Sequence, residues 1–235
     1  MAKYVILIAG NICTGKTKFV EYLREQTSQF TEFLQGDERL SVVAEFIDPV
    51  GLENFYHERK ASTSQFEMTC LNGRINRYIK AKRSLDLCIF DRGMIDGAET
   101  FCKNSFLEGY LSHDDYELYQ RTIKKALDNL DRTEQPQWLE QLVVYFRTEN
   151  FTCLHQRQQE RKTEGELIPL NYLQHIHEKY EEFFQNIRAV YRSYGVQVPR
   201  VLTIDASVNF YEDKDYHRRT LEQLVQAMRK DFATK

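Results

Sequence analysis

The residues best suited to chemistry form a glycine-rich loop that ends in lysine and threonine: Gly10, Asn11, Ile12, Cys13, Thr14, Gly15, Lys16 and Thr17. This spacing is that of a phosphate-binding loop, and an apolar, β-branched run precedes it while helical spacing follows it. Such a loop turns backbone N–H groups toward a phosphate, and the helix N-terminus adds partial positive charge. We therefore expect all eight residues to bind nucleotide phosphates, with Lys16 on the β- and γ-phosphates and the Thr17 hydroxyl on Mg²⁺. A glycine-rich turn without a ligand is the alternative, and the flanking elements disfavour it.

The elements that must position this loop follow from hydrophobic periodicity. Apolar runs of strand length occur at residues 4–9, 40–44, 87–90, 142–146 and 201–204, and their continuity predicts strands buried on both faces. Helices are expected at about 17–30, 52–56, 64–81, 95–101, 114–131, 151–161, 170–194 and 218–232. The alternation predicts an α/β fold, a doubly wound five-stranded parallel sheet flanked by helices.

Charged residues follow several of the predicted strands. Glu45 follows the second, Asp91 and Arg92 the third, and Arg147 the fourth. Ligands of such sheets bind at the carboxyl ends of the strands. A helix cap or a surface salt bridge could explain any one of these residues, but their coincidence beside a phosphate loop favours a site.

Composition excludes several classes of partner. The chain has 235 residues, is 42% hydrophobic and carries a net charge of −3, which suits one domain over residues 1–235. No global basic field exists to hold a nucleic acid polymer, and no apolar run approaches the ~20 residues of a membrane span. The first predicted strand begins within four residues of the N-terminus, so we expect no signal peptide.

The cysteines are odd in number and lack a metal-ligand spacing: Cys13, Cys70, Cys88, Cys102 and Cys153. We therefore expect free thiols and a cytoplasmic location. Cys13 is interpreted as a small loop residue in preference to a redox control point.

Several short motifs follow one another along the chain: Gly10-Asn11-Ile12, residues 42–45, Tyr56 eleven residues before Glu67, Phe66-Glu67 with Arg74 seven residues on, Asp91-Arg92-Gly93, and residues 168–173. In type and order they resemble the motifs of the deoxynucleoside kinase family. The chain departs from the family pattern at Phe46, where proline is usual, at Glu67, where glutamine is usual, and at Gly93, where serine is usual.

The resemblance implies a P-loop kinase fold and an ATP-dependent kinase of nucleotide salvage, which phosphorylates the 5′-hydroxyl of a deoxynucleoside with Mg²⁺ as cofactor. Glu45 would take the hydroxyl proton, Arg92 and Lys16 would complete the catalytic set, and Asp91 would join Thr17 at the metal. It also implies a homodimer formed through helices such as 64–81 and 114–131.

The resemblance further implies a short lid at about 157–166, whose arginines close over the phosphates. Arg157 and Arg161 lie four residues apart and would share a helix face. The family's usual arginine positions fall instead on Gln156, Glu160 and Lys162, so a local shift would be needed for Arg157 and Arg161 to act.

The nucleoside would then contact Tyr56, Glu67, Arg74, Asp96 and a lid glutamate. Tyr56 corresponds to the family's contact with the sugar 3′-hydroxyl, and Glu164 is the candidate lid residue, with Glu166 as its alternative. The aspartate that usually partners the base-reading arginine falls on Gly97, one residue after Asp96.

Glu67 is the residue that discriminates most between bases. A carboxylate only accepts hydrogen bonds, and guanine presents two adjacent donors, whereas adenine and cytosine place an acceptor beside a donor. Arg74 would suit the guanine O6 and N7. We therefore predict a preference for deoxyguanosine or a related 6-oxopurine. Three alternatives stay open: a protonated Glu67, a role for Gln65 in its place, and a Glu67–Arg74 pair that meets no base.

Other classes fit less well. A nucleoside monophosphate kinase of the thymidylate kinase type shares the phosphate loop but needs further arginines for the acceptor phosphate. A GTPase-like binder needs an Asn-Lys-x-Asp motif, which the chain lacks. A catalytically inactive relative is disfavoured because Lys16, Thr17, Glu45 and Arg92 are all present.

Overall fold

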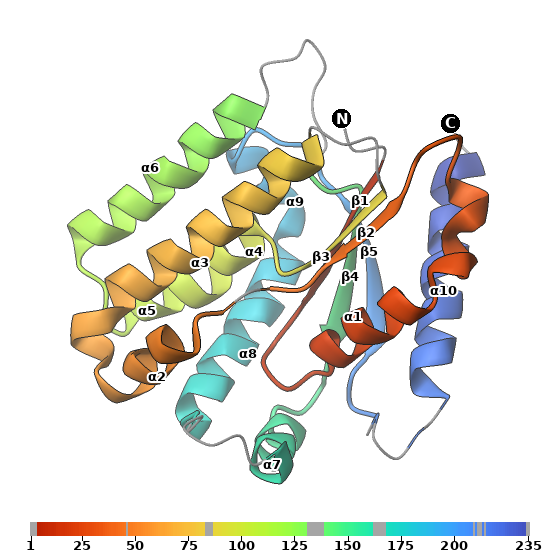
Figure 1. Cartoon of the computed structure of the whole chain (residues 1–235). Helices are drawn as coiled ribbons and strands as arrows, with labels where there is room; N and C mark the ends of the chain where they lie inside the picture. The colour runs from red at the N-terminus through yellow and green to blue at the C-terminus, as the bar shows by residue number, and fades with distance from the viewer. Residues whose placement is uncertain are drawn as a thin grey trace.

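The structure is a computed structural model that describes residues 4–45, 47–82, 87–130, 139–161, 168–208, 210, 213 and 215–233. Its centre is a sheet of five strands in the order β2-β3-β1-β4-β5, every neighbouring pair parallel (Figure 1). The strands are β1 Tyr4–Gly10, β2 Leu40–Val43, β3 Leu87–Asp91, β4 Leu142–Arg147 and β5 Arg200–Asp205. The predicted α/β class and five-stranded parallel sheet are confirmed.

Helices cover both faces of this sheet. On one face lie α1 (Lys16–Glu25), the 3₁₀ segment Thr27–Phe33 and α10 (Tyr216–Ala233) (Figure 1). On the other lie α3 (Arg59–Lys82), α6 (His113–Leu130), α8 (Leu170–Gln185) and α9 (Ile187–Ser193). The same layer contains α4 (Met94–Gly97), a π turn at Ala98–Cys102 and α5 (Lys103–Leu107). The helices α2 (Pro49–His57) and α7 (Thr152–Arg161) lie near the carboxyl ends of the strands (Figure 1).

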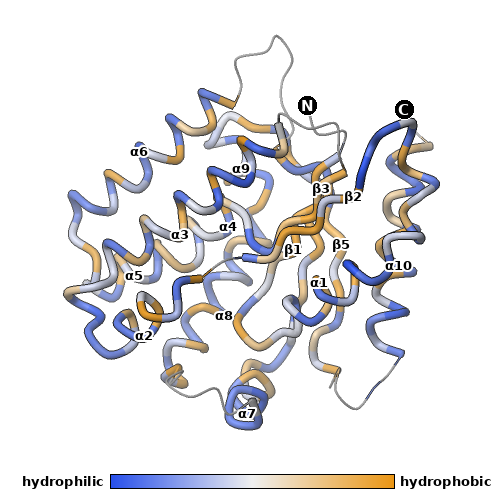
Figure 2. Tube along the Cα trace, in the orientation of Figure 1, coloured by the Kyte–Doolittle hydropathy of each residue, from blue (hydrophilic) through white to orange (hydrophobic). Residues whose placement is uncertain are grey.

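The hydrophobic core follows the centre of the sheet, where the apolar residues of the chain gather (Figure 2). The central strands β1 and β3 are buried along their whole length. The edge strands differ: β2 is half-buried throughout, and Val201 on β5 is 39% exposed. The prediction that all five strands are buried on both faces is therefore wrong for β2 and β5, because an edge strand has a neighbour on one side only.

Three predicted helices are interrupted. The segment 17–30 breaks at Gln26, after which the chain continues as a 3₁₀ segment. The segment 95–101 passes from α4 into the π turn. The segment 170–194 divides at Asn186, whose side-chain amide donates to the Glu182 carbonyl 2.9 Å away and so ends α8. Within the described residues, no helix has both the length and the apolar character needed to cross a bilayer.

Candidate active site

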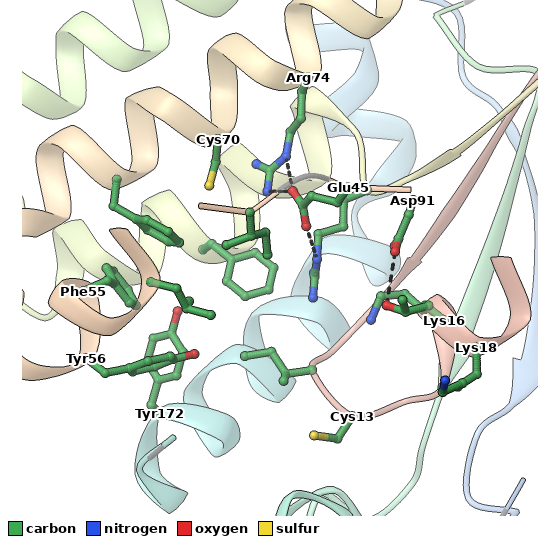
Figure 3. A pocket seen from close by; sticks show the side chains of 18 of the residues that line it. Cys13, Lys16, Lys18, Glu45, Phe55, Tyr56, Cys70, Arg74, Asp91 and Tyr172 are labelled. Atoms are coloured by element: carbon green, nitrogen blue, oxygen red, sulfur yellow. Dashed lines mark hydrogen bonds and ion pairs between the residues drawn. The ribbon is translucent and has the colours of Figure 1, made fainter. Parts of the chain in front are cut away.

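A cavity of about 590 Å³ opens where the strands end, beside the phosphate loop (Figure 3). This volume lies in the range of small-molecule sites. Predicted site residues that line it are Ile12, Cys13, Gly15, Lys16, Thr17, Glu45, Tyr56, Glu67, Arg74, Asp91, Arg92 and Arg157. The chain thus brings together residues that lie more than a hundred positions apart in the sequence.

The phosphate loop owes its shape to residues with positive φ. Gly10 has φ 143°, and a Cβ there would lie 2.6 Å from the carbonyl oxygen of Phe146 on β4. Gly15 has φ 90°, and a Cβ there would lie 2.7 Å from the ring of Phe210. Both positions therefore exclude a side chain. Cys13 also adopts a left-handed conformation, with φ 62°. This fits its interpretation as a small loop residue.

Lys16 is buried at the base of the loop. Its ammonium donates to the Asn11 carbonyl and to the Thr14 hydroxyl, the latter at 3.2 Å. Burial, together with the nearby charge of Arg92, lowers the pKa of Lys16 to about 7. A polyanion placed against this lysine would favour its charged form, so the loop is electrostatically suited to a phosphate chain.

The side chains of Thr17 and Asp91 form a pair of oxygen donors next to Lys16. The Thr17 hydroxyl lies 3.4 Å from Asp91 Oδ2, while Asp91 Oδ1 is buried without a hydrogen-bond partner. Burial raises the pKa of Asp91, and the charge of Lys16 opposes that rise. No three acidic, histidine or cysteine side chains gather around one point in the described residues. Two protein oxygens nonetheless fit Mg²⁺, which usually keeps several waters and takes further ligands from substrate phosphates.

Glu45 is clamped between two arginines (Figure 3). Its Oε1 accepts from Arg74 Nε at 2.9 Å and Nη2 at 2.6 Å, and its Oε2 lies 2.9 Å from Arg92 Nε. Burial alone would raise the pKa of Glu45, but the charges of Arg74 and Arg92 outweigh it and hold the pKa below its usual value. Glu45 is therefore a carboxylate at neutral pH.

Arg92 adopts the left-handed conformation, with φ 59°. Its Nη1 donates to the Tyr180 hydroxyl at 2.8 Å and to the Gly10 carbonyl at 3.3 Å, and its guanidinium lies 4.4 Å from the centre of the Phe101 ring. The side chain thus joins the end of β3 to the phosphate loop and to α8.

Arg77 is a site residue that the sequence analysis missed. Its Nη1 donates to the Asp91 carbonyl at 2.7 Å and its Nη2 to the Arg92 carbonyl at 2.9 Å. It lies three residues after Arg74 on α3, so one helix face supplies an arginine to Glu45 and another to the Asp91-Arg92 backbone. That spacing is the signal that could have identified it.

Glu67 is buried in the cavity wall, where its Oε1 accepts from the Ser105 hydroxyl at 3.1 Å. Arg74 forms its ion pair with Glu45, so the alternative in which Glu67 pairs with Arg74 is wrong. Burial raises the pKa of Glu67 to about 7, although the charge of Arg74 opposes it. Both the charged and the neutral acid are therefore accessible near neutral pH.

Arg74 reaches Glu45 by passing over Gly97. A Cβ at Gly97 would lie 1.9 Å from Arg74 Nη1, so any side chain there would displace the guanidinium. Arg74 Nη1 itself is buried without a hydrogen-bond partner. The departure from the family pattern at Gly97 thus has a packing reason in this chain.

Asp96 and Tyr56 occupy different surroundings. Tyr56 lines the cavity and meets Tyr172 edge-on, with 6.1 Å between ring centres. Asp96 is fully buried, and its Oδ1 accepts from the Gly93 amide at 2.6 Å. Its Oδ2 accepts from the Tyr180 hydroxyl at 3.4 Å. Both Asp96 oxygens are therefore engaged within the protein.

Arg157 is a buried residue of α7 whose side chain contacts the segment that follows β5. Its Nη1 donates to the Ala206 carbonyl at 2.7 Å, its Nη2 to the Val208 carbonyl at 2.7 Å, and its guanidinium lies 5.4 Å from the centre of the Phe210 ring. These contacts connect α7 to the edge of the phosphate-loop cavity. The side chain of Arg161 and the whole of Glu164 lie outside the described residues.

Arg147 does not join the site, although its place after a strand suggested that it could. Its side chain is 43% exposed and pairs with Glu181 on α8 at 2.8 Å. This correction follows from the salt-bridge alternative noted for such residues.

Comparisons with known proteins show which proteins this chain is similar to. Thymidine kinase 2, mitochondrial, from Homo sapiens is 27% identical over 185 residues, and the protein of that name from Macaca fascicularis is 26% identical over 183. Each match covers 77% of this chain but only 64% of the relative's length.

Solved structures share the fold. Deoxyadenosine kinase from M. mycoides with bound dATP superposes with a TM-score of 0.69, and the same enzyme with bound dCTP with 0.63. Both are 19% identical to this chain, and each superposition covers 94% of this chain and 98% of the other. A family model described as deoxynucleoside kinase matches residues 6–229, and the chain therefore belongs to the deoxynucleoside kinase family.

Proposed function

We propose that the protein transfers the γ-phosphate of ATP to the 5′-hydroxyl of a deoxynucleoside. The observation that carries the proposal is the position of Glu45, an ionised carboxylate between Arg74 and Arg92 in the same cavity as the phosphate-loop lysine. A hydroxyl acceptor needs a nearby base, and a phosphoryl donor needs concentrated positive charge. The cavity offers both.

In this mechanism the acceptor hydroxyl gives its proton to Glu45 as its oxygen attacks the γ-phosphorus. The bond from that phosphorus to the β,γ-bridging oxygen breaks, and ADP leaves. Lys16 and Arg92 offset the negative charge of the phosphoryl group in flight, and the loop backbone holds the donor phosphates in line. Thr17 and Asp91 would hold Mg²⁺, which when bound supplies charge neutralisation on the donor phosphates. Few residues are needed, because phosphoryl transfer depends mainly on positioning and charge.

We also propose that the acceptor base is a 6-oxopurine, with deoxyguanosine favoured. Glu67 lines the cavity, and its carboxylate can accept from both guanine N1–H and the 2-amino group. Those two donors would favour the charged acid, whereas adenine or cytosine would require the neutral acid or leave a lone pair unmatched. The relatives described above are named for thymidine and deoxyadenosine, so the comparisons do not supply the preference for guanine. That part of the proposal rests on Glu67.

Phosphate transfer from ATP with Mg²⁺ to each common deoxynucleoside, ribonucleoside and nucleoside monophosphate tests the proposal. We expect turnover of deoxynucleosides, with deoxyguanosine first. Turnover confined to monophosphates would overturn it in favour of a nucleoside monophosphate kinase. Glu45 would then not act as the base for an acceptor hydroxyl. Turnover led by another base would remove only the role given to Glu67.

Four further features belong to this proposal: a single domain over residues 1–235, a lid at about 157–166, a cytoplasmic location and a homodimer. Arg157, Arg161 and Glu164 would act from the lid. Cys70, Cys102 and Cys153 are free thiols, in keeping with a reducing compartment. The helices α3 and α6 pack side by side, and Leu118 on α6 is 48% exposed, which suits a dimer contact. Light scattering on the purified chain tests the dimer.

A further inference from the structure

A closed ring of hydrogen bonds surrounds Arg92. Its Nη1 donates to the Tyr180 hydroxyl at 2.8 Å, and that hydroxyl donates to Asp96 Oδ2 at 3.4 Å. The other oxygen of Asp96 accepts from the backbone amide of Gly93 at 2.6 Å. Gly93 is the next residue after Arg92, so the ring connects the guanidinium to its own main chain through α8 and α4.

The ring lies in a dry part of the molecule. Tyr180 and Asp96 are fully buried, and Arg92 is 8% exposed. In such surroundings a lost hydrogen bond to a charged group is costly, because no water replaces it. The ring therefore favours one orientation of an otherwise flexible side chain.

Arg92 needs such support for two reasons. Its backbone holds φ 59°, a conformation that non-glycine residues adopt only when their surroundings stabilise it. Its guanidinium must also keep one orientation: Nε faces Glu45 at 2.9 Å while the Phe101 ring covers one face at 4.4 Å from its centre. The hydrogen bond from Arg92 Nη1 to the Tyr180 hydroxyl then prevents the guanidinium from turning within its own plane.

We propose that Tyr180 and Asp96 are positioning residues that hold Arg92 in register with Glu45 for phosphoryl transfer. This inference rests on the proposed function. It gives Asp96 a task other than reading the nucleobase, because both Asp96 oxygens are engaged in the ring and Asp96 does not line the cavity among the described residues. Tyr180 acts through Arg92 and need not touch substrate.

The test is a double-mutant cycle on the full chain with the best deoxynucleoside. Tyr180→Phe removes the hydroxyl and keeps the aromatic side chain. We expect kcat to fall about ten- to a hundredfold with the nucleoside KM nearly unchanged. In an Arg92→Ala background the same change should have little further effect on kcat, because the guanidinium that Tyr180 positions is no longer there. An equal loss in both backgrounds would overturn the inference.

Tyr4→Phe is the matched control. Tyr4 is also fully buried and its hydroxyl also meets a carboxylate, that of Asp231, but it lies at the opposite end of β1 from the phosphate loop. We expect kcat to be unchanged by this variant. A drop equal to that of Tyr180→Phe would mean that loss of any buried tyrosine hydroxyl lowers activity, and the inference would fail.

Asp96→Asn separates positioning from base reading. We expect a lower kcat for every deoxynucleoside by a similar factor, so that the ratios between bases stay constant. A change in those ratios with kcat for the preferred base retained would assign Asp96 to the base and overturn its positioning role.

Thermal unfolding of the same Tyr180 and Arg92 variants provides a readout that does not need activity. Non-additive shifts in Tm are expected because the two side chains are in contact, and additive shifts would contradict that contact. If the wild-type chain phosphorylates no nucleoside, the proposed function is wrong. The Tm values of the same variants still test the contact between Tyr180 and Arg92. An active wild-type chain with an unaffected Tyr180→Phe variant would sink the inference alone.

Discussion

The phosphate loop and the Asp91-Arg92-Gly93 turn end neighbouring parallel strands, and each contains a non-glycine residue with positive φ, Cys13 at 62° and Arg92 at 59°. They are stabilised in different ways. The loop is shaped by its own glycines and by its own lysine, which donates back to Asn11 and Thr14. The turn is held by side chains from distant elements, Arg77 on α3 and Tyr180 on α8. Residues near in sequence thus account for the shape of the loop, whereas the side chains that hold the turn come from tertiary contacts that the motif does not report.

The largest effect is expected in the loop. Lys16→Met should lower kcat about a thousandfold or more, since it removes charge that stabilises the transition state. It should also raise Tm, because the buried ammonium has a pKa of about 7 in the fold and an ordinary value when unfolded. The unfolded chain therefore binds more protons between about pH 7 and 10, and the penalty is largest below pH 7.

Kinetics and thermal melts at pH 6 and pH 9 check this prediction. The gain in Tm over wild type should be greater at pH 6. A destabilised variant at pH 6 would show that the hydrogen bonds of Lys16 outweigh its burial, and that the loop depends on its lysine for shape as well as for charge.

In the turn, Arg77→Met should lower kcat about tenfold while leaving ATP binding intact. The change leaves the carbonyls of Asp91 and Arg92 without their donors, and each unpaired buried group costs about 1–3 kcal/mol. Steady-state kinetics and ATP titration measure the two effects separately. The matched control is Lys80→Met, which removes an exposed cation from the same helix and should change neither quantity. Weaker ATP binding by Arg77→Met would mean that loop and turn are not independent.

On the acceptor side of the turn, Glu67→Gln should lower the preference for deoxyguanosine over deoxyadenosine about tenfold. The amide can donate as well as accept, so adenine no longer faces an unmatched group. Competition between the two nucleosides gives the ratio of kcat/KM values. The control is Gln65→Glu, two residues earlier on α3. If Gln65→Glu shifted the ratio and Glu67→Gln did not, residue 65 and not residue 67 would read the base.

The smallest effect concerns a buried acid behind the turn. Glu140 is fully buried with the hydroxyls of Tyr78 and Tyr191 on its carboxyl, and a Cβ at Gly93 would lie 3.1 Å from its Oε1. Burial raises the pKa of Glu140 to about 8. The folded chain thus holds one proton more than the unfolded chain between about pH 4.5 and 8, and stability falls as pH rises through that window.

Glu140→Gln should therefore leave Tm nearly unchanged at pH 5 and raise it by a few degrees at pH 8. Melting curves of both proteins across this range decide the matter. Equal shifts at the two pH values would show that Glu140 does not change its protonation on unfolding.

Much of the fold could be predicted because its signals are local. Continuous apolar runs identified all five strands, and the glycine loop identified the end of the sheet at which the cavity lies. Helix limits were less accurate where a single residue such as Asn186 ends one helix and begins the next. Burial of β2 and β5 was overestimated because strand order depends on pairing over long distances, which residue type does not report.

By itself, the sequence determined the phosphate loop, the parallel sheet and the types of residue that meet at its edge, because each depends on near neighbours and on periodicity. Only the tertiary structure decided which partner each charge takes. Arg74 pairs with Glu45 and not with Glu67, Asp96 turns to Gly93 and Tyr180, and Arg157 donates to the chain after β5. The physical reason is that a buried charge is stabilised by the groups that packing brings within about 3 Å, and those groups come from anywhere in the chain.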